Sequence, residues 1–181
     1  MKLWLVRHPP VEVEPGTCYG RTDLALAEPV EPALTAIESL VGPAAALVTS
    51  PAARCRRVAL HLGHRLGLAA AEDSRWQELD FGAWEGRPWT ALAGAELDGW
   101  AEGYWHVAPP GGERYRELVD RVEAALAALA PLDTAIVTHA GPIRAALSLL
   151  LGWTRERLPE ITVPAGTVIA LERGPAGWTR C

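Results

Sequence analysis

The chain has 181 residues, of which 49% are hydrophobic and 22% are charged, and its formal net charge at pH 7 is -5. This length favours a single domain, 1–181, with a substantial core, and this composition excludes an intrinsically disordered chain. The lack of a basic excess argues against a dedicated nucleic-acid binder, although a local cluster of arginines could still bind a small anion. All apolar runs fall well short of the roughly 20 residues that a membrane span needs.

The start of the chain and its cysteines predict a cytoplasmic location. The first apolar run is too short for the core of a secretory signal, and charged residues follow it at once. The three cysteines, Cys18, Cys55 and Cys181, form no C-x-x-C pair. This odd number predicts neither a disulfide framework nor structural zinc, which fits a reducing compartment.

The first predicted strand, over 3–6, ends in unusual polar residues. The run LWLV is typical of a short buried strand, and Arg7 and His8 follow it directly. Pro9 and Pro10 then remove two backbone donors and fix two φ angles, so the strand cannot continue beyond His8. The sequence therefore places an arginine and a histidine at a rigid strand end.

Further along the chain, apolar runs alternate with segments of helical spacing. Three more runs predict strands, and three segments predict helices: strands at 45–50, 134–139 and 167–172, and helices at 51–67, 111–131 and 141–152. This alternation predicts an α/β fold with a largely parallel sheet. The segment 76–112 is rich in tryptophan and glycine, and it fits a lid or insertion over a site and a satellite hydrophobic cluster equally well.

Two more of the predicted strands end in polar residues. The strand at 45–50 is followed by Arg54 in the first turn of a helix, and the strand at 134–139 ends in His139. Ligands of open α/β sheets bind at the carboxyl ends of the strands, so parallel neighbours would bring two histidines and two arginines into one pocket. Arginine forks and helix N-termini suit a dianionic phosphate, and a histidine there could attack phosphorus to form a phosphohistidine.

Hydrolysis would also need a proton donor for the leaving alkoxide. The stretch RWQELDFGAWEG offers three carboxyl groups, those of Glu78, Asp80 and Glu85. Apolar and aromatic neighbours favour the protonated form of a carboxyl group, which suits a general acid near neutral pH. The residue pattern alone leaves the choice among the three open.

Each of these residues also has an ordinary structural explanation. A single histidine at a strand end is more often a hydrogen-bonded structural residue, and an arginine at a helix start is more often solvated. Three polar strand ends in one chain favour the functional explanation. His61 and His64 lie three residues apart on a predicted helix, but no cysteine or carboxylate stands beside them, so no metal site is predicted.

Four short segments of the chain are similar to motifs of a known family. LVRHPP, TSPAARCRRVA, ELDFGAWEG and VTHAGPIRA occur in this order. With them, the chain resembles the histidine phosphatase superfamily, the phosphoglycerate-mutase-like proteins, over nearly its whole length. The resemblance implies a three-layer α/β/α sandwich with a mostly parallel sheet, and a phosphatase that uses no metal and no cofactor.

The resemblance also implies a role for each candidate residue. His8 would be the nucleophile that accepts the phosphoryl group, and Arg7, Arg54 and the catalytic His139 would complete the phosphate pocket. Glu78 lies four residues before a glycine, as the family's acid does, and would be the proton donor. The resemblance thus selects Glu78 from the three carboxyl groups.

Two positions depart from the family pattern. Pro9 and Ala140 stand where the family usually has glycine. Neither change removes a catalytic side chain, but Pro9 has no backbone N–H to offer to phosphate. Anion binding at this loop must therefore rely on side chains and on other segments.

The segment RHPPVEVEPGTCYGRTDLAL is most similar to the α-ribazole phosphatases of cobalamin synthesis. This similarity implies α-ribazole 5′-phosphate as the substrate, with Arg21 in the substrate pocket and Glu113 in the family's Gly-Gly-Glu turn. The alternatives are a phosphoglycerate mutase, a broad-specificity sugar-phosphate phosphatase and a non-catalytic phosphate-binding module. The expected partner is a small phosphomonoester, not a nucleic acid or a membrane, and the oligomeric state, a homodimer or otherwise, stays open.

Overall fold

A mostly parallel sheet forms the centre of the molecule. The computed structural model describes residues 1–92 and 94–181, and its strands are β1 Lys2–Arg7, β2 Ala46–Thr49, β3 Ala71–Glu72, β4 Thr134–Thr138, β5 Val168–Gly174 and β6 Gly177–Arg180. They form a six-stranded sheet in the order β3-β2-β4-β1-β5-β6. The first four strands in this order pair in parallel, whereas β5 and β6 are antiparallel to their neighbours. The expected mostly parallel sheet is confirmed.

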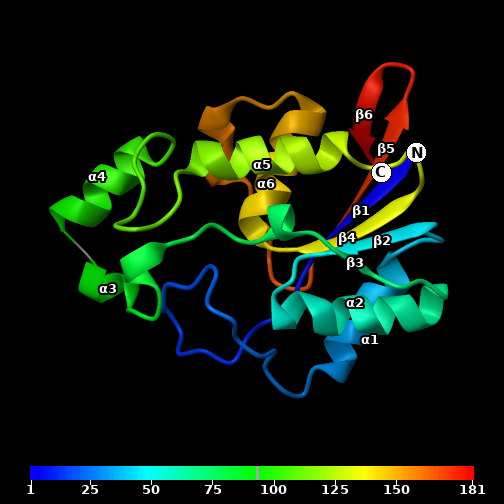
Figure 1. Ribbon diagram of the computed structural model, residues 1–181, viewed down its shortest axis with the longest axis horizontal. Helices are drawn as coiled ribbons and strands as arrows, with labels where there is room; N and C mark the ends of the chain where they lie inside the picture. The colour runs from blue at the N-terminus through cyan, green and yellow to red at the C-terminus, as the bar shows by residue number, and fades with distance from the viewer. Residues whose placement is uncertain (93) are drawn as a thin grey trace.

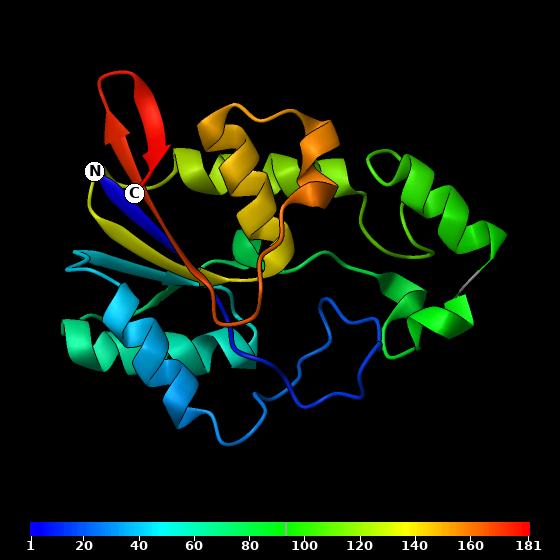
Figure 2. The same cartoon turned by 180° about the vertical axis from the view of Figure 1, so that it is seen from behind.

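Helices cover both faces of the sheet. They are α1 Glu31–Leu40, α2 Ala53–Leu66, α3 Trp89–Leu92, α4 Ala95–Gly103, α5 Tyr115–Ala127 and α6 Ala140–Leu151, with short 3-10 helices η1 Ser74–Trp76, η2 Gly82–Trp84 and η3 Arg155–Glu160. α1 and α2 lie on one face of the sheet and α5 and α6 on the other (Figures 1 and 2). This arrangement is the expected three-layer α/β/α sandwich. Within the described residues, no helix is long and apolar enough to cross a membrane.

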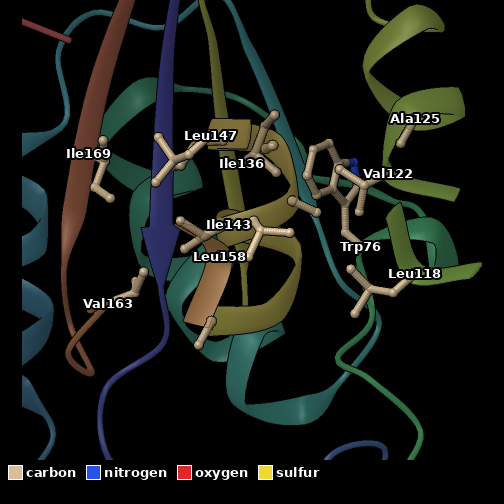
Figure 3. Close-up of a cluster of buried hydrophobic side chains, with 14 of the residues drawn as sticks. Trp76, Leu118, Val122, Ala125, Ile136, Ile143, Leu147, Leu158, Val163 and Ile169 are labelled. Carbon is tan, nitrogen blue, oxygen red and sulfur yellow. The ribbon is translucent and has the colours of Figure 1, made fainter. Parts of the chain in front are cut away.

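The central strands are buried on both faces. Leu3 and Leu5 of β1 belong to the core under α5 and α6, whereas Trp4 and Val6 belong to the core under α1 and α2. Because side chains alternate along a strand, a continuous apolar run is needed to fill both cores. Figure 3 shows the first core, in which Trp76 packs among apolar side chains of α5, α6 and the sheet.

Several elements differ in extent from the sequence-based expectation. The helices expected at 51–67, 111–131 and 141–152 are α2, α5 and α6, with ends that differ by up to four residues. α5 begins late because the preceding Gly-Gly turn packs against the backbone of Asp80. A Cβ atom on Gly112 would lie 2.4 Å from the Asp80 carbonyl oxygen. α1, β3 and β6 were not expected, since β3 and β6 are short edge strands and α1 buries few apolar residues.

The tryptophan-rich segment 76–112 contributes to two separate cores. Trp76 is buried in the core under α5 and α6, whereas Trp84 packs with Cys18 in a small cluster of its own. α3 and α4, from this segment, lie beyond one end of the sheet, on the same side as the loop that follows β1 (Figure 2). Ala93 of this segment lies outside the described residues. A satellite cluster is thus present, and the lid stays a prediction.

Candidate active site

Polar strand ends meet at one edge of the sheet. β4 lies between β2 and β1 with all three parallel, and the register pairs Arg7 with Thr138. The residues that follow these two are therefore neighbours, and the ring centroids of His8 and His139 are 5.2 Å apart. The two histidines that the sequence placed on different strands do come together.

His8 is buried and held in one tautomer. The residue is 1% exposed, and its Nδ1 lies 2.6 Å from the carbonyl oxygen of Pro9. A carbonyl can only accept a hydrogen bond, so Nδ1 carries the proton and Nε2 keeps its lone pair. Burial, followed by the positive charge of Arg54, lowers the pKa of His8 to about 3, although the bond to Pro9 opposes the shift. At neutral pH His8 is therefore the neutral, nucleophilic form.

His139 is the N-cap residue of α6 and is also buried. Its Nε2 lies 2.8 Å from Ser50 Oγ, at the end of β2, and 3.5 Å from the thiol of Cys55. Burial, followed by the nearby His8 and Arg54, lowers the pKa of His139 well below its usual value. Both histidines are thus neutral hydrogen-bonding groups at physiological pH.

The guanidinium groups of Arg7 and Arg54 are anchored on backbone carbonyls. Arg7 Nη1 donates to the carbonyl of Val163 at 2.5 Å, and Arg54 donates to the carbonyls of Thr22 and Gly20 at 2.8 and 2.6 Å. The Nε–H group of each arginine is buried and has no hydrogen-bond partner among the described residues. Carbonyl anchors orient an arginine without neutralising it, so both positive charges stay available to an anion.

Glu78 lies against the N-terminus of α6, next to His139. The N–H of Gly141 donates to both carboxyl oxygens of Glu78, at 3.1 and 3.2 Å. A Cβ atom on Gly141 would lie 2.2 Å from Glu78 Oε1, so only glycine leaves room for this contact. The sequence pattern did not single out Gly141, although the glycine directly before Pro142 in VTHAGPIRA was the available signal.

The other two carboxyl groups of the same stretch hold the backbone of nearby loops. Glu85 accepts hydrogen bonds from the N–H groups of Arg21, Thr22 and Phe81 at 2.8, 2.6 and 3.2 Å. Burial alone would raise the pKa of Glu85, but these bonds and that of the Thr22 hydroxyl outweigh it and lower the pKa. Asp80 accepts from the N–H of Gly82 at 2.8 Å. Among the three, Glu78 is the one bound beside His139.

Arg21 and Glu113 form a small charged network near Glu78. Arg21 is about one third exposed, and its two Nη atoms lie 3.4 Å from Asp80 Oδ2 and 3.5 Å from Glu113 Oε2. Glu113 is largely buried, and its carboxylate accepts from Nε and Nη2 of Arg121 at 2.7 and 2.9 Å. Arg121 also donates to the carbonyl of Glu78 at 3.1 Å. The sequence pattern gave no reason to single out Arg121, which lies inside a helix far along the chain.

A cavity of about 300 Å³ opens beside Glu78. Aromatic side chains of the α4 and α5 regions and one arginine of α6 line it together with Glu78, namely Trp100, Tyr104, Tyr115 and Arg144. Larger hollows of about 640 and 440 Å³ lie on the β3 side of the molecule and contain none of the candidate residues. The cavity beside Glu78 borders the candidate site through Glu78 and Gly141, whereas His8, His139, Arg7 and Arg54 do not line it.

Comparison with known proteins identifies the family. The family model of the histidine phosphatase superfamily (branch 1) matches residues 3–180. A relative from Salmonella paratyphi B, "Probable phosphoglycerate mutase GpmB", is 33% identical over 123 residues, which are 62% of this chain and 57% of the relative. The chain thus aligns with little more than half the length of that relative.

Solved structures share the fold over the whole chain. The α-ribazole phosphatase of Shigella flexneri has a TM-score of 0.90 at 22% identity and covers 100% of this chain and 95% of that one. The mycobacterial glucosyl-3-phosphoglycerate phosphatase has a TM-score of 0.84 at 23% identity and covers 99% of this chain and 96% of that one. At these identities the likeness establishes the fold. The two histidines that meet at the ends of the strands are consistent with the family match. Because the family model matches residues 3–180, this chain belongs to the histidine phosphatase superfamily, branch 1.

Proposed function

We propose that the protein is a phosphomonoester hydrolase that works through a phosphohistidine on His8. One observation carries this proposal: two uncompensated guanidinium groups, Arg7 and Arg54, surround a buried neutral histidine whose Nε2 keeps its lone pair. Cationic donors around a neutral nucleophile suit attack on a dianionic phosphoryl group.

In the proposed first step, Nε2 of His8 attacks phosphorus and the bond from phosphorus to the leaving oxygen breaks. Arg7, Arg54 and His139 stabilise the phosphoryl oxygens, and the carboxyl group of Glu78 protonates the leaving alkoxide. In the second step, the Glu78 carboxylate takes a proton from water, and this water attacks phosphorus. The P–N bond breaks, inorganic phosphate is released, and His8 returns to its neutral form.

Labelling of His8 tests this mechanism. Brief exposure to a phosphomonoester labelled in its phosphate should give an acid-labile, base-stable label, which His8→Ala should lose together with turnover. His61→Ala is the control, because His61 lies on α2 and pairs with Glu38 at 2.6 Å, so label and turnover should persist. Turnover should also survive a chelator. Undiminished turnover in His8→Ala would refute the proposal, and phosphate binding without turnover in the unmodified protein would favour a non-catalytic module.

For the substrate, we propose α-ribazole 5′-phosphate. The similarity of the segment RHPPVEVEPGTCYGRTDLAL to α-ribazole phosphatases supports it, and so do the aromatic walls of the cavity beside Glu78, since flat rings stack on aromatic faces. Arg21 would contact the substrate at the edge of the site, and Glu113 would act on the substrate by holding Arg21. We further propose that the segment 76–112, which contributes Trp100 and Tyr104 to the walls of this cavity, serves as a lid over it.

One observation favours a second substrate class. Arg144 lines the same cavity, and a guanidinium group there would suit a carboxylate-bearing leaving group such as that of 3-phosphoglycerate. Comparing kcat/KM for α-ribazole 5′-phosphate, 3-phosphoglycerate and fructose bisphosphate separates the classes. We expect the highest value for α-ribazole 5′-phosphate. A preference for the glycerate with isomerised product would identify a mutase instead.

A further inference from the structure

We propose that Arg121 is a positioning residue for the general acid. It holds the segment 75–80, here called the acid strap, in the one conformation that places the Glu78 carboxyl group against α6. This inference rests on the proposed role of Glu78 as proton donor.

Arg121 uses all five of its N–H donors on the acid strap and its neighbour Glu113. Nη1 donates to the carbonyls of Arg75 and Gln77, both at 2.7 Å. Nη2 donates to the carbonyl of Glu78 at 3.1 Å and to Glu113 Oε2 at 2.9 Å, and Nε donates to Glu113 Oε1 at 2.7 Å. The side chain is only 15% exposed, so these bonds are largely protected from water. A planar fork with every donor used fixes the positions of three carbonyls at once.

The acid strap depends on such bonds because it belongs to neither the sheet nor a long helix. It runs from η1 to η2, and side chains bind four consecutive carbonyl groups in it. Arg121 donates to the carbonyls of Arg75, Gln77 and Glu78. The hydroxyl of Thr138 donates to the carbonyl between them, that of Trp76, at 2.6 Å. Thr138 directly precedes His139. The same contacts therefore fix the position of the acid strap relative to the end of β4, which is followed by His139.

Glu113 completes this arrangement at the far end of the acid strap. Its N–H donates to the Asp80 carbonyl at 2.9 Å, and its carboxylate accepts from the Asp80 N–H at 3.4 Å. Glu113 also neutralises Arg121, so the expected effect of Arg121 on catalysis is geometric. A proton donor displaced by about 1 Å from its leaving oxygen loses on the order of 10²-fold in rate.

Leaving-group dependence tests this role. An alkoxide needs the proton from Glu78, whereas p-nitrophenolate departs without one. We therefore expect Arg121→Lys to lower kcat/KM for an alkyl phosphate by about 10²-fold and that for p-nitrophenyl phosphate by less than about tenfold. kcat/KM is the right quantity, because it includes phosphoryl transfer to His8 and excludes hydrolysis of the phosphohistidine, in which Glu78 acts again.

Three further variants make the result decisive. Arg116→Lys, at an exposed position of the same helix, should leave both values unchanged. Glu113→Gln should show the same split, a larger loss of kcat/KM for the alkyl phosphate than for p-nitrophenyl phosphate, but in weaker form. It replaces Arg121→Lys as the test if Arg121→Lys does not fold. Glu78→Gln should show the split in full.

The outcomes separate this inference from the proposed function. A split in Glu78→Gln with equal losses on both substrates in folded Arg121→Lys and Glu113→Gln would overturn the positioning role alone. No split in Glu78→Gln would overturn Glu78 as proton donor, and the inference with it. A split in all three variants supports both.

Discussion

Gly141 shows how a single residue controls the candidate proton donor. Its N–H group holds both oxygens of Glu78, and its missing side chain leaves the space that the carboxyl group occupies. The neighbouring Ala140, where the family usually has glycine, is one residue away and tolerates a methyl group. The requirement for glycine at this helix start is therefore local to one position and comes from close approach of a side chain.

Gly141→Ala should therefore damage activity more than stability. Its Cβ would lie 2.2 Å from Glu78 Oε1, and the carboxyl group must move away. We expect kcat/KM for an alkyl phosphate to fall by about 10²-fold. Alanine is about 1 kcal/mol more favourable than glycine in a helix, which offsets part of the strain. The thermal unfolding midpoint should therefore fall only slightly.

Gly174→Ala is the control for this substitution. Gly174 ends β5, next to the edge strand β6, and the nearest atom to an added Cβ atom would be the Gly177 carbonyl oxygen at 3.9 Å, an ordinary van der Waals distance. This substitution should leave kcat/KM unchanged. Full activity in folded Gly141→Ala would show that Glu78 does not need the position seen here.

At the scale of elements, hydrogen bonds at the end of β1 fix the position of His8. The backbone of His8 bonds on both sides: its N–H donates to the Thr138 carbonyl at 3.2 Å, and its carbonyl accepts from the N–H of Gly166 at 3.0 Å. Its ring donates to the Pro9 carbonyl. Pro9 thus contributes an acceptor that any residue could supply, while its ring restricts the backbone.

Pro9→Gly should change kcat only modestly, by less than about tenfold, because the carbonyl acceptor and both backbone bonds of His8 remain. Stability should fall by about 0.4–1 kcal/mol, since glycine increases the conformational entropy of the unfolded chain. Steady-state kinetics and thermal unfolding measure the two effects. A collapse in kcat with a folded protein would show that the proline ring, and not the hydrogen bonds, positions the nucleophile.

At the scale of the whole molecule, the site places two neutral histidines inside the protein. Unfolding returns them to water, where their ordinary pKa is about 6.5. The unfolded chain therefore binds more protons than the folded protein as pH falls below that value. The contribution of these histidines to stability is thus complete above pH 6.5 and decreases toward acid, for His8 down to its folded pKa of about 3.

The free energy of unfolding should accordingly fall by about 1.4 kcal/mol per pH unit for each buried histidine below pH 6. Urea unfolding at pH 7, 6 and 5 measures this slope. His8→Asn should make it shallower by the contribution of one histidine, because asparagine has no charge to gain. Carboxyl groups with lowered pKa values, such as Glu85, act in the same direction but at lower pH. An unchanged slope in His8→Asn would show that His8 is not buried in its neutral form.

The architecture and the candidate histidines and arginines follow from local patterns in the sequence. Continuous apolar runs with helical segments between them favoured a mostly parallel sheet covered on both faces, because such strands must be buried on both sides. The run at 167–172 nevertheless became the antiparallel strand β5. Polar residues directly after three of these runs had to meet at one edge, which brought His8 and His139 together. These are consequences of residue pattern and of strand direction, so they can be predicted from the sequence.

How those groups are held depends on tertiary packing instead. The residue pattern left Glu78, Asp80 and Glu85 open and the resemblance selected Glu78, whereas only the fold shows that Glu78 accepts from the N–H of Gly141, 63 positions away in the chain. Arg121 reaches the acid strap across more than forty residues. Such contacts follow from how helices pack on the sheet, and short-range periodicity carries no information about that packing. The candidate residues can therefore be named from the sequence, while their orientation is a property of the folded molecule.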